Sequence, residues 1–227
     1  MKRVFDYSRD LLKGIAIVSM TFDHIGVILY PTELAFLMVG RLAFPIFAYL
    51  LVLGIEDTQN VKAYFLRLFF FGLISQIPYF LAFGLTPIGR LNIFFSLLLG
   101  ALTIYFLNTK SPFVILPFLF SFILNSEGNI FSIAIIIGMK ILQENPKLGI
   151  AIISVLNVPF LFSQDIVQNI QIASLVALPL IILHTRDRLK LEIEISKNST
   201  LYSIRRYAFY IYYPLHLTLL YLVSLSF

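Results

Sequence analysis

The stretch that decides the fold runs from residue 63 to residue 84 and reads AYFLRLFFFGLISQIPYFLAFG. It carries one charged side chain, Arg67, near its beginning, and its apolar residues do not alternate with polar ones. About 20 such residues form a helix long enough to cross the hydrocarbon core of a bilayer. The stretch therefore predicts a transmembrane helix rather than part of a soluble core.

The composition of the whole chain agrees with this prediction. Of its 227 residues, 59% are apolar and 13% are charged, whereas soluble domains carry about 25% charged residues. The chain has no cysteine, which excludes disulfides, thiolate metal sites and cysteine nucleophiles. We predict an all-α, polytopic transmembrane bundle in the cell membrane, formed by one domain over residues 1–227.

Apolar runs separated by charge or by Pro, Gly and Asn clusters predict nine multi-pass spans. The middle segments are short for a full crossing, so two of them could form one re-entrant hairpin. The predicted spans are 11–30, 34–54, 63–84, 92–107, 112–124, 130–143, 149–163, 170–184 and 207–227.

The placement of positive charge predicts a cytoplasmic N-terminus and an external C-terminus. The net charge of +5 then reflects cytoplasmic loops, and no nucleic-acid partner is expected. The polar segment 185–206 is expected to be an interfacial loop or short amphipathic helix that contacts lipid headgroups or an anionic cofactor. With this orientation only Arg41 and Arg90 lie away from the cytoplasmic side, which receives Lys2, Arg3, Arg9, Lys13, Lys62, Arg67, Lys110, Lys140, Lys147, Arg186, Arg188, Lys190, Lys197, Arg205 and Arg206.

Four ionisable side chains lie well away from the ends of the predicted spans, where each costs at least a few kcal/mol to insert and a functional role is the default expectation. Asp23 and His24 lie roughly 15 Å above the start of the first span, and Arg41 lies roughly 10 Å below the outer end of the second. The last span brings His216 to a similar depth. These four residues are therefore predicted to line one cavity in the outer half of the membrane.

Structural explanations stay open for these polar groups. Asp23 and Arg41 can form an ion pair that only fixes helix packing. The amides of Gln76 and Asn92, near the outer half, can bind a substrate or hydrogen-bond between helices. His184 is expected at the cytoplasmic interface, beside the basic segment.

Prolines fall in the same layer of the membrane. Pro45 cannot donate a hydrogen bond to the carbonyl of Arg41, and Pro78 and Pro214 free two further helix carbonyls. Such carbonyls are tolerated only where they face protein, water or a ligand. Pro45 and Pro214 are therefore expected to bend the walls of the predicted cavity.

Several motifs resemble the TraX family, which is named for the protein that acetylates the N-terminus of F-type conjugative pilin. The resemblance covers roughly residues 11–100 and the last span. It also extends to a broader class of transmembrane acyltransferases. The motifs are LKGIAIVSMTFDH (Leu12–His24), GRLAFPIFAYL (Gly40–Leu50), Y-x-x-RLFFFGLISQIP (Tyr64–Pro78), NIFFSLLLG (Asn92–Gly100) and YPLHL (Tyr213–Leu217).

The resemblance implies an acyltransferase, most simply an acetyltransferase, that uses cytoplasmic acetyl-CoA. The implied acceptor is an amine or hydroxyl reached from the outer half of the membrane, with a pilin N-terminus as one candidate. His24 would be the general base, with a covalent acyl-imidazole as the alternative. Asp23 would orient the site, Arg41 would offset oxyanion charge, and His216 with Tyr213 would form a second acid or positioning pair.

The donor would be bound from the cytoplasmic side. Within the broader class, the acyltransferase-three group carries on its first helix an Arg followed eleven positions later by His, and this chain has Lys13 and His24 at that spacing. Eleven residues make almost three helical turns, so both side chains share a face with about 16 Å of rise between them. Lys13 is expected to contact phosphate with help from Arg9 and Arg67. No metal is implied.

Two other functions compete with this interpretation. In a proton-coupled transporter or exporter, Asp23 and the histidines would form a proton relay. The two halves of the chain show no clear inverted repeat, which disfavours that reading. A purely structural assembly factor in the membrane is the third alternative.

Overall fold

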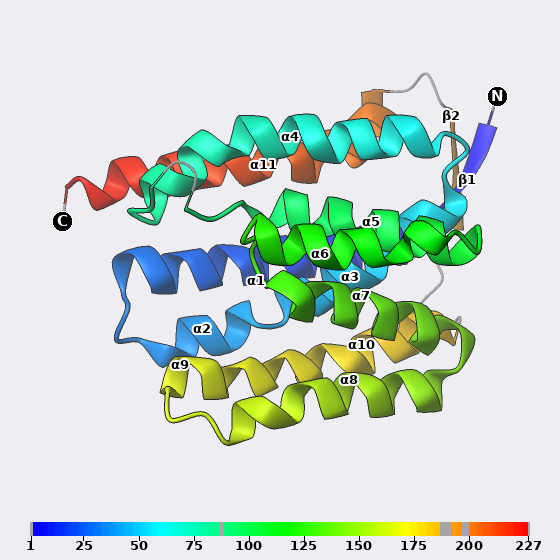
Figure 1. The fold of residues 1–227 in the computed structure, drawn as a ribbon. Helices are drawn as coiled ribbons and strands as arrows, with labels where there is room; N and C mark the ends of the chain where they lie inside the picture. Colours follow the sequence, from blue (N-terminus) through cyan, green and yellow to red (C-terminus); the bar gives the residue numbers. More distant parts are fainter. Residues whose placement is uncertain (1, 87–88, 187–191, 197–199, 227) are drawn as a thin grey trace.

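The computed structural model describes residues 2–86, 89–186, 192–196 and 200–226, which form a helical bundle with a small β-ribbon at one end (Figure 1). The strands are β1 (Lys2–Asp6) and β2 (Glu192–Ser196), and two 3-10 helices are η1 (Pro112–Ile115) and η2 (Ile170–Val176). The α-helices are α1 (Tyr7–Leu29), α2 (Leu34–Gly40), α3 (Ala43–Asp57), α4 (Val61–Ala82), α5 (Ile93–Asn108), α6 (Leu116–Ile123), α7 (Asn129–Glu144), α8 (Pro146–Leu161), α9 (Ile166–Asn169), α10 (Ala177–Thr185) and α11 (Thr200–Ser224).

Several helical segments are suited to a membrane. Within the described residues, four are long and apolar enough to cross it, namely Tyr7–Leu29, Leu34–Asp57, Val61–Ala82 and Ile166–Thr185. Shorter apolar helices occur at Ile93–Asn108, Pro112–Ile123 and Pro146–Leu161. Helical segments are found at each predicted span, but nine crossings and their orientation stay predictions.

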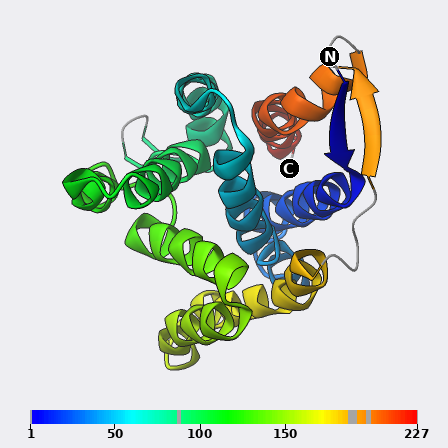
Figure 2. The ribbon, with the colours of Figure 1, turned by 90° about the vertical axis from the view of Figure 1, so that its right-hand side faces the viewer.

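The centre of the bundle is α3, which α1, α5, α7 and α10 surround in the view along the helices (Figure 2). Most of its side chains are buried, including Ile46, Ala48 and Val52, which are fully covered. This helix is apolar on all sides, as expected for an element that contacts protein rather than lipid or water. Residues on α3 can therefore contact interior spaces on either side of it.

The second predicted span is divided into two helices. The sequence predicts one continuous helix over residues 34–54, but α2 ends at Gly40 and α3 begins at Ala43. Pro45 explains the break, because it has no N–H for the carbonyl of Arg41 and its ring collides with that carbonyl. Arg41 therefore lies in a turn between two helices instead of inside one.

The expected all-α bundle is present, and a short β-ribbon that the sequence did not indicate is added at the end that carries the N-terminus. There β1 and β2 pair antiparallel, with Arg3 opposite Ile195 and Phe5 opposite Ile193. The sequence Glu192-Ile193-Glu194-Ile195 alternates polar and apolar residues with the period of a strand, which the prediction of an interfacial loop or amphipathic helix missed. The last helix also begins at Thr200 rather than 207, because hydropathy marks only its apolar part. Residues 187–191 and 197–199 of that segment lie outside the described residues.

We call the end with β1 and β2 the proximal end, and the end where the chain reaches its C-terminus the distal end (Figure 1). The first helix runs from proximal to distal, and the chain returns through α2 and α3. Residues 83–86, 89–92 and 124–128 lie in loops at the distal end, since the first two segments follow α4 and the third precedes α7. These loops supply site residues described below.

Candidate functional site

Two histidines from opposite ends of the sequence meet inside the bundle. Nδ1 of His24 on α1 lies 2.7 Å from Nε2 of His216 on α11. Both side chains are buried, and their rings are parallel to within 4°. Tyr212 also fixes the two helices together, because its hydroxyl lies 2.7 Å from Oγ1 of Thr21. The predicted convergence of His24 and His216 is therefore present in the structure.

The hydrogen-bond network assigns the tautomers of this histidine pair. Nδ1 of His216 lies 3.0 Å from the carbonyl oxygen of Tyr212, which can only accept, so this nitrogen carries a proton and donates it. In the neutral ring Nε2 of His216 is then an acceptor, and Nδ1 of His24 donates to it. Nε2 of His24 consequently keeps its lone pair, as a general base requires.

Asp23 and Arg41 lie together, as the depth argument predicts. Nη1 of Arg41 is 3.6 Å from Oδ1 of Asp23, within ion-pair range but longer than a hydrogen bond. Gly40 makes this approach possible, because a Cβ at that position would overlap the Cβ and Oδ1 of Asp23. The break after α2 therefore brings a guanidinium against the carboxylate that precedes His24.

A cavity of about 560 Å³ connects these groups, and we call it the distal cavity. Its size lies within the range of about 300–1,000 Å³ for small-molecule sites. Among its lining residues are all five predicted catalytic residues except His216, together with two charged residues that no motif marked. These lining residues include Asp23, His24, Arg41, Tyr213, Arg90 and Glu127.

Glu127 is the charged residue of the site that the sequence did not indicate. It lies in the loop between α6 and α7, outside the helices, so a search for ionisable groups within spans overlooks it. Its backbone is fixed from both sides, since its N–H donates to the carbonyl of Leu91 and its carbonyl accepts from Oγ of Ser96. Burial raises the pKa of Glu127 to about 7, against the opposing effect of Arg90.

The side chains of Gln76 and Asn92 form hydrogen bonds that stabilise the turn before α5, and they do not line the distal cavity. Nδ2 of Asn92 donates to Oε1 of Gln76 at 2.8 Å and to the carbonyl of Gly72 at 2.7 Å. Nε2 of Gln76 donates to the carbonyl of Arg90 at 2.8 Å, and Oδ1 of Asn92 caps α5 through the N–H of Phe94. These bonds place Arg90 beside the distal cavity and engage both amides within the protein, and their substrate-binding role stays a prediction.

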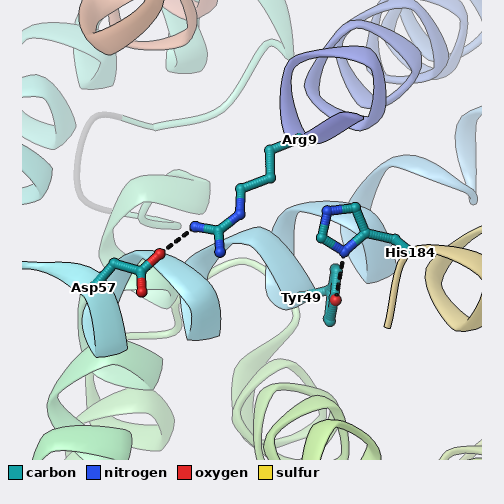
Figure 3. Close-up of polar contacts among 4 residues, drawn as sticks. All are labelled: Arg9, Tyr49, Asp57 and His184. Carbon is teal, nitrogen blue, oxygen red and sulfur yellow. Dashed lines mark hydrogen bonds and ion pairs between the residues drawn. The ribbon is translucent and has the colours of Figure 1, made fainter. Parts of the chain in front are cut away.

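The predicted donor-binding cations converge on a separate cavity of about 240 Å³ near the proximal end, which we call the proximal cavity. Its lining includes Arg9, Lys13, Arg67 and Arg206. Arg9 pairs with Asp57, as Figure 3 shows, and Lys13 lies 3.7 Å from Asp10. Nε of Arg67 is buried and has no hydrogen-bond partner among the described residues.

His184 is buried against α3, and its position at the membrane interface stays a prediction. Its Nδ1 lies 2.8 Å from the hydroxyl of Tyr49 on α3, and only 3% of the residue is exposed (Figure 3). Thr185 donates a second hydrogen bond to the same hydroxyl. Hydropathy shows only that His184 precedes the basic segment. The structure adds that its side chain packs against α3 and is covered by protein.

The two cavities share one wall residue, Phe47 on α3. Its ring packs against that of Phe209 on α11 with centroids 4.3 Å apart, and 8% of Phe47 is exposed. Phe209 lines the proximal cavity and lies beside Tyr213, which lines the distal one. A thin aromatic partition therefore separates the cationic cavity from the cavity of His24.

Comparison with known proteins gives a family match over nearly the whole chain. The model of the family described as TraX protein matches residues 8–224. The chain belongs to the TraX protein family. Together with the apolar helices, this membership identifies a membrane protein of that family.

Curated relatives match shorter regions. The chain is 33% identical to protein TraX of Escherichia coli over 104 residues, which cover 45% of this chain and 41% of the relative. It is 37% identical to a probable fimbrial assembly protein FimC of Dichelobacter nodosus over 81 residues, 34% of this chain and 33% of that one. An uncharacterised protein of Rickettsia prowazekii is 32% identical over 102 residues, 45% of this chain and 38% of that protein. The alignments thus span well under half of each relative, and no solved structure matches.

Proposed function

We propose that this TraX-family protein is a multi-pass acetyltransferase of the cell membrane. It would take an acetyl group from acetyl-CoA at the cytoplasmic, proximal end and transfer it to an amine or hydroxyl that reaches the distal cavity. The observation that carries the proposal is the hydrogen-bonded pair His24–His216, which leaves a ring nitrogen of His24 as a base beside a cavity of ligand size.

The lining of the proximal cavity supports the proposal of a coenzyme A donor. The donor combines anionic phosphates with a long neutral arm, and the cavity combines cations with leucine side chains. Arg67 offers a buried N–H without a hydrogen-bond partner among the described residues, and guanidinium groups bind phosphate strongly. At about 240 Å³ the cavity suits a segment of the donor rather than the whole molecule. Its apolar lining includes Leu50, Leu51, Leu53, Leu68 and Leu97.

The distal residues would carry the transfer. His24 would remove a proton from the acceptor through Nε2, while His216 would hold the imidazole in that tautomer. Arg41 would offset negative charge on the acyl oxygen, although the pairing with Asp23 moderates this effect. Acetyl-CoA supplies the activated acyl group, and Phe47 would have to move aside for the thioester to reach His24.

Measurement of coenzyme A release by the purified protein, with acetyl-CoA and candidate acceptors, tests this proposal. His24→Ala should lower the rate at saturating donor by about a hundredfold or more, because that is the usual contribution of a general base. Lys13→Ala and Arg67→Ala should chiefly raise the acetyl-CoA concentration needed. Lys62→Ala, an exposed cation outside the cavity, is the matched control and should change neither quantity.

The transporter alternative predicts a different outcome. If His24→Ala turned over normally, the assignment of the base would be refuted. A proton-coupled transporter would then have to show flux driven by a pH gradient, with loss of that flux in Asp23→Asn. The pilin N-terminus belongs among the candidate acceptors because of the family resemblance, and a peptide with a free N-terminus is the simplest form in which to test it.

A further inference from the structure

Glu127 has an unsatisfied carboxylate oxygen inside the site. Its Oε2 is buried and finds no hydrogen-bond partner among the described residues. Leaving such an atom unpaired destabilises the empty site, and the backbone that carries this side chain is held in place because both its N–H and its carbonyl are bonded. A polar group that is rigidly placed and unpaired in the empty site is expected to bind a hydrogen-bond donor of a ligand.

Glu127 lines two adjoining cavities at the distal end. It belongs to the wall of the distal cavity and to that of an adjoining cavity of about 490 Å³. Tyr213 contributes a second unsatisfied atom, since its hydroxyl is buried without a hydrogen-bond partner among the described residues. A ligand that enters here meets Oε2 of Glu127 and the hydroxyl of Tyr213, close to the cavity wall formed by His24. Oδ1 of Asp23 in the same wall also lacks a hydrogen bond, but it faces Nη1 of Arg41 at 3.6 Å.

The chemistry of the acceptor decides how many bases the site needs. A hydroxyl loses one proton when it is acylated, so His24 alone suffices. An amine is protonated near neutral pH, and it must lose one proton before it can attack and a second to become an amide. His24 can receive only one of the two at a time, because its other ring nitrogen is bonded to His216.

We propose that Glu127 is the second proton acceptor of the site and binds the protonated amino group of an amine acceptor. This inference rests on the proposed acyl transfer. An N–H bond of the ammonium group breaks and an O–H bond forms on Glu127. The nitrogen then bonds to the acyl carbon as the C–S bond breaks, and His24 passes the second proton from nitrogen to the departing thiolate. Glu127 finally releases its proton to water at the distal end.

Binding of a matched pair of compounds tests the cation site without any turnover. Glycinamide and glycolamide differ only in an amino group against a hydroxyl, and calorimetry at pH 7 compares their affinities. We expect glycinamide to bind the wild type at least about tenfold more tightly, as a charge-assisted hydrogen bond allows. Glu127→Gln should abolish the preference. Glu33→Gln, which changes an exposed glutamate at the same end, should keep it.

A second measurement tests proton transfer itself. With glycinamide as acceptor, Glu127→Gln should slow coenzyme A release by about a hundredfold at pH 7. The defect should shrink about tenfold for each pH unit until the amine is mostly unprotonated, since free amine needs no first base. Glu127→Asp should restore part of the rate, and a melting curve checks that each variant is folded.

These outcomes separate the inference from the proposed function. Equal affinity for the two compounds, absence of binding by both, or a Glu127→Gln defect that does not change with pH would overturn the role of Glu127 alone. A wild type that prefers glycinamide through Glu127 but releases no coenzyme A would refute the acetyltransferase and the proton transfer, and would leave the ammonium site standing.

Discussion

At the scale of single residues, the histidine pair has a directional hydrogen-bond chain. It runs from Nδ1 of His24 to His216 and on to the carbonyl of Tyr212, so each ring is held in one tautomer. His216 does not line the distal cavity in the described residues, which fits a positioning residue better than the second acid that the sequence allowed. The chain of bonds therefore distinguishes the two histidines by role.

A variant of His216 tests this distinction. His216→Ala should lower coenzyme A release less than His24→Ala does, because the base remains but loses its fixed tautomer. The acetyl-CoA concentration at half-maximal rate should stay unchanged, since His216 does not line the proximal cavity. Steady-state kinetics of both variants provide the comparison. A larger loss in His216→Ala than in His24→Ala would exchange the two roles.

Glu127 predicts how stability depends on pH. Its pKa rises from 4.5 to about 7 on folding, so between these values the folded protein holds a proton that the unfolded chain has lost. Stability contributed by the neutral form is therefore present below about pH 4.5 and declines up to about pH 7. The thermal midpoint of the wild type should fall relative to that of Glu127→Gln over this range, and parallel midpoints would contradict the burial of the charge. The groups that face Glu127 are Asp23, Arg41, Tyr79, Arg90 and Tyr213.

At the scale of elements, the contact between α1 and α2 depends on one missing side chain. Gly40→Ala would place a methyl group on the backbone and side chain of Asp23, and such overpacking typically costs about 1–3 kcal/mol. The thermal midpoint should drop, and activity should drop with it because Arg41 follows directly. Gly14→Ala on α1 is the control, since nothing lies within 4 Å of its added methyl. Equal midpoints for both variants would show that α2 can shift freely.

The same scale shows what could be predicted from sequence. Helix positions followed from apolar runs, and the pairing of Asp23 with Arg41 and the shared depth of His24 and His216 followed from their places in the spans. Pro45 marked the break in the second span, but the break itself was not predicted, since a proline can bend a helix as well as end it. Glu127 could not be recognised because it lies in a loop whose position depends on two residues distant in sequence. The carbonyl of Leu91 accepts from the N–H of Glu127, and Oγ of Ser96 donates to its carbonyl.

At the scale of the whole molecule, orientation decides whether the proposed donor can reach its cavity. Charge placement predicts the proximal end in the cytoplasm, where acetyl-CoA is available. Reporter fusions after Lys62 and Lys147 should therefore report the cytoplasm, and fusions after Gly84 and Ser163 should report the outside. A fusion series with the opposite sides would remove access to the donor and with it the acetyltransferase proposal.

The partition of Phe47 and Phe209 has an electrical consequence. Two water-accessible spaces that met across the membrane would conduct protons and discharge the gradient that powers the cell. The partition of Phe47 and Phe209 must therefore block the passage of protons between the two cavities, and it must also open to admit a thioester. Proteoliposomes with a trapped pH dye should hold a gradient with the wild type and lose it faster with Phe47→Ala, while Phe70→Ala, on an exposed face of α4, should behave as the wild type. If the pH gradient decayed equally fast with the wild type and both variants, the barrier to protons would not be the partition of Phe47 and Phe209.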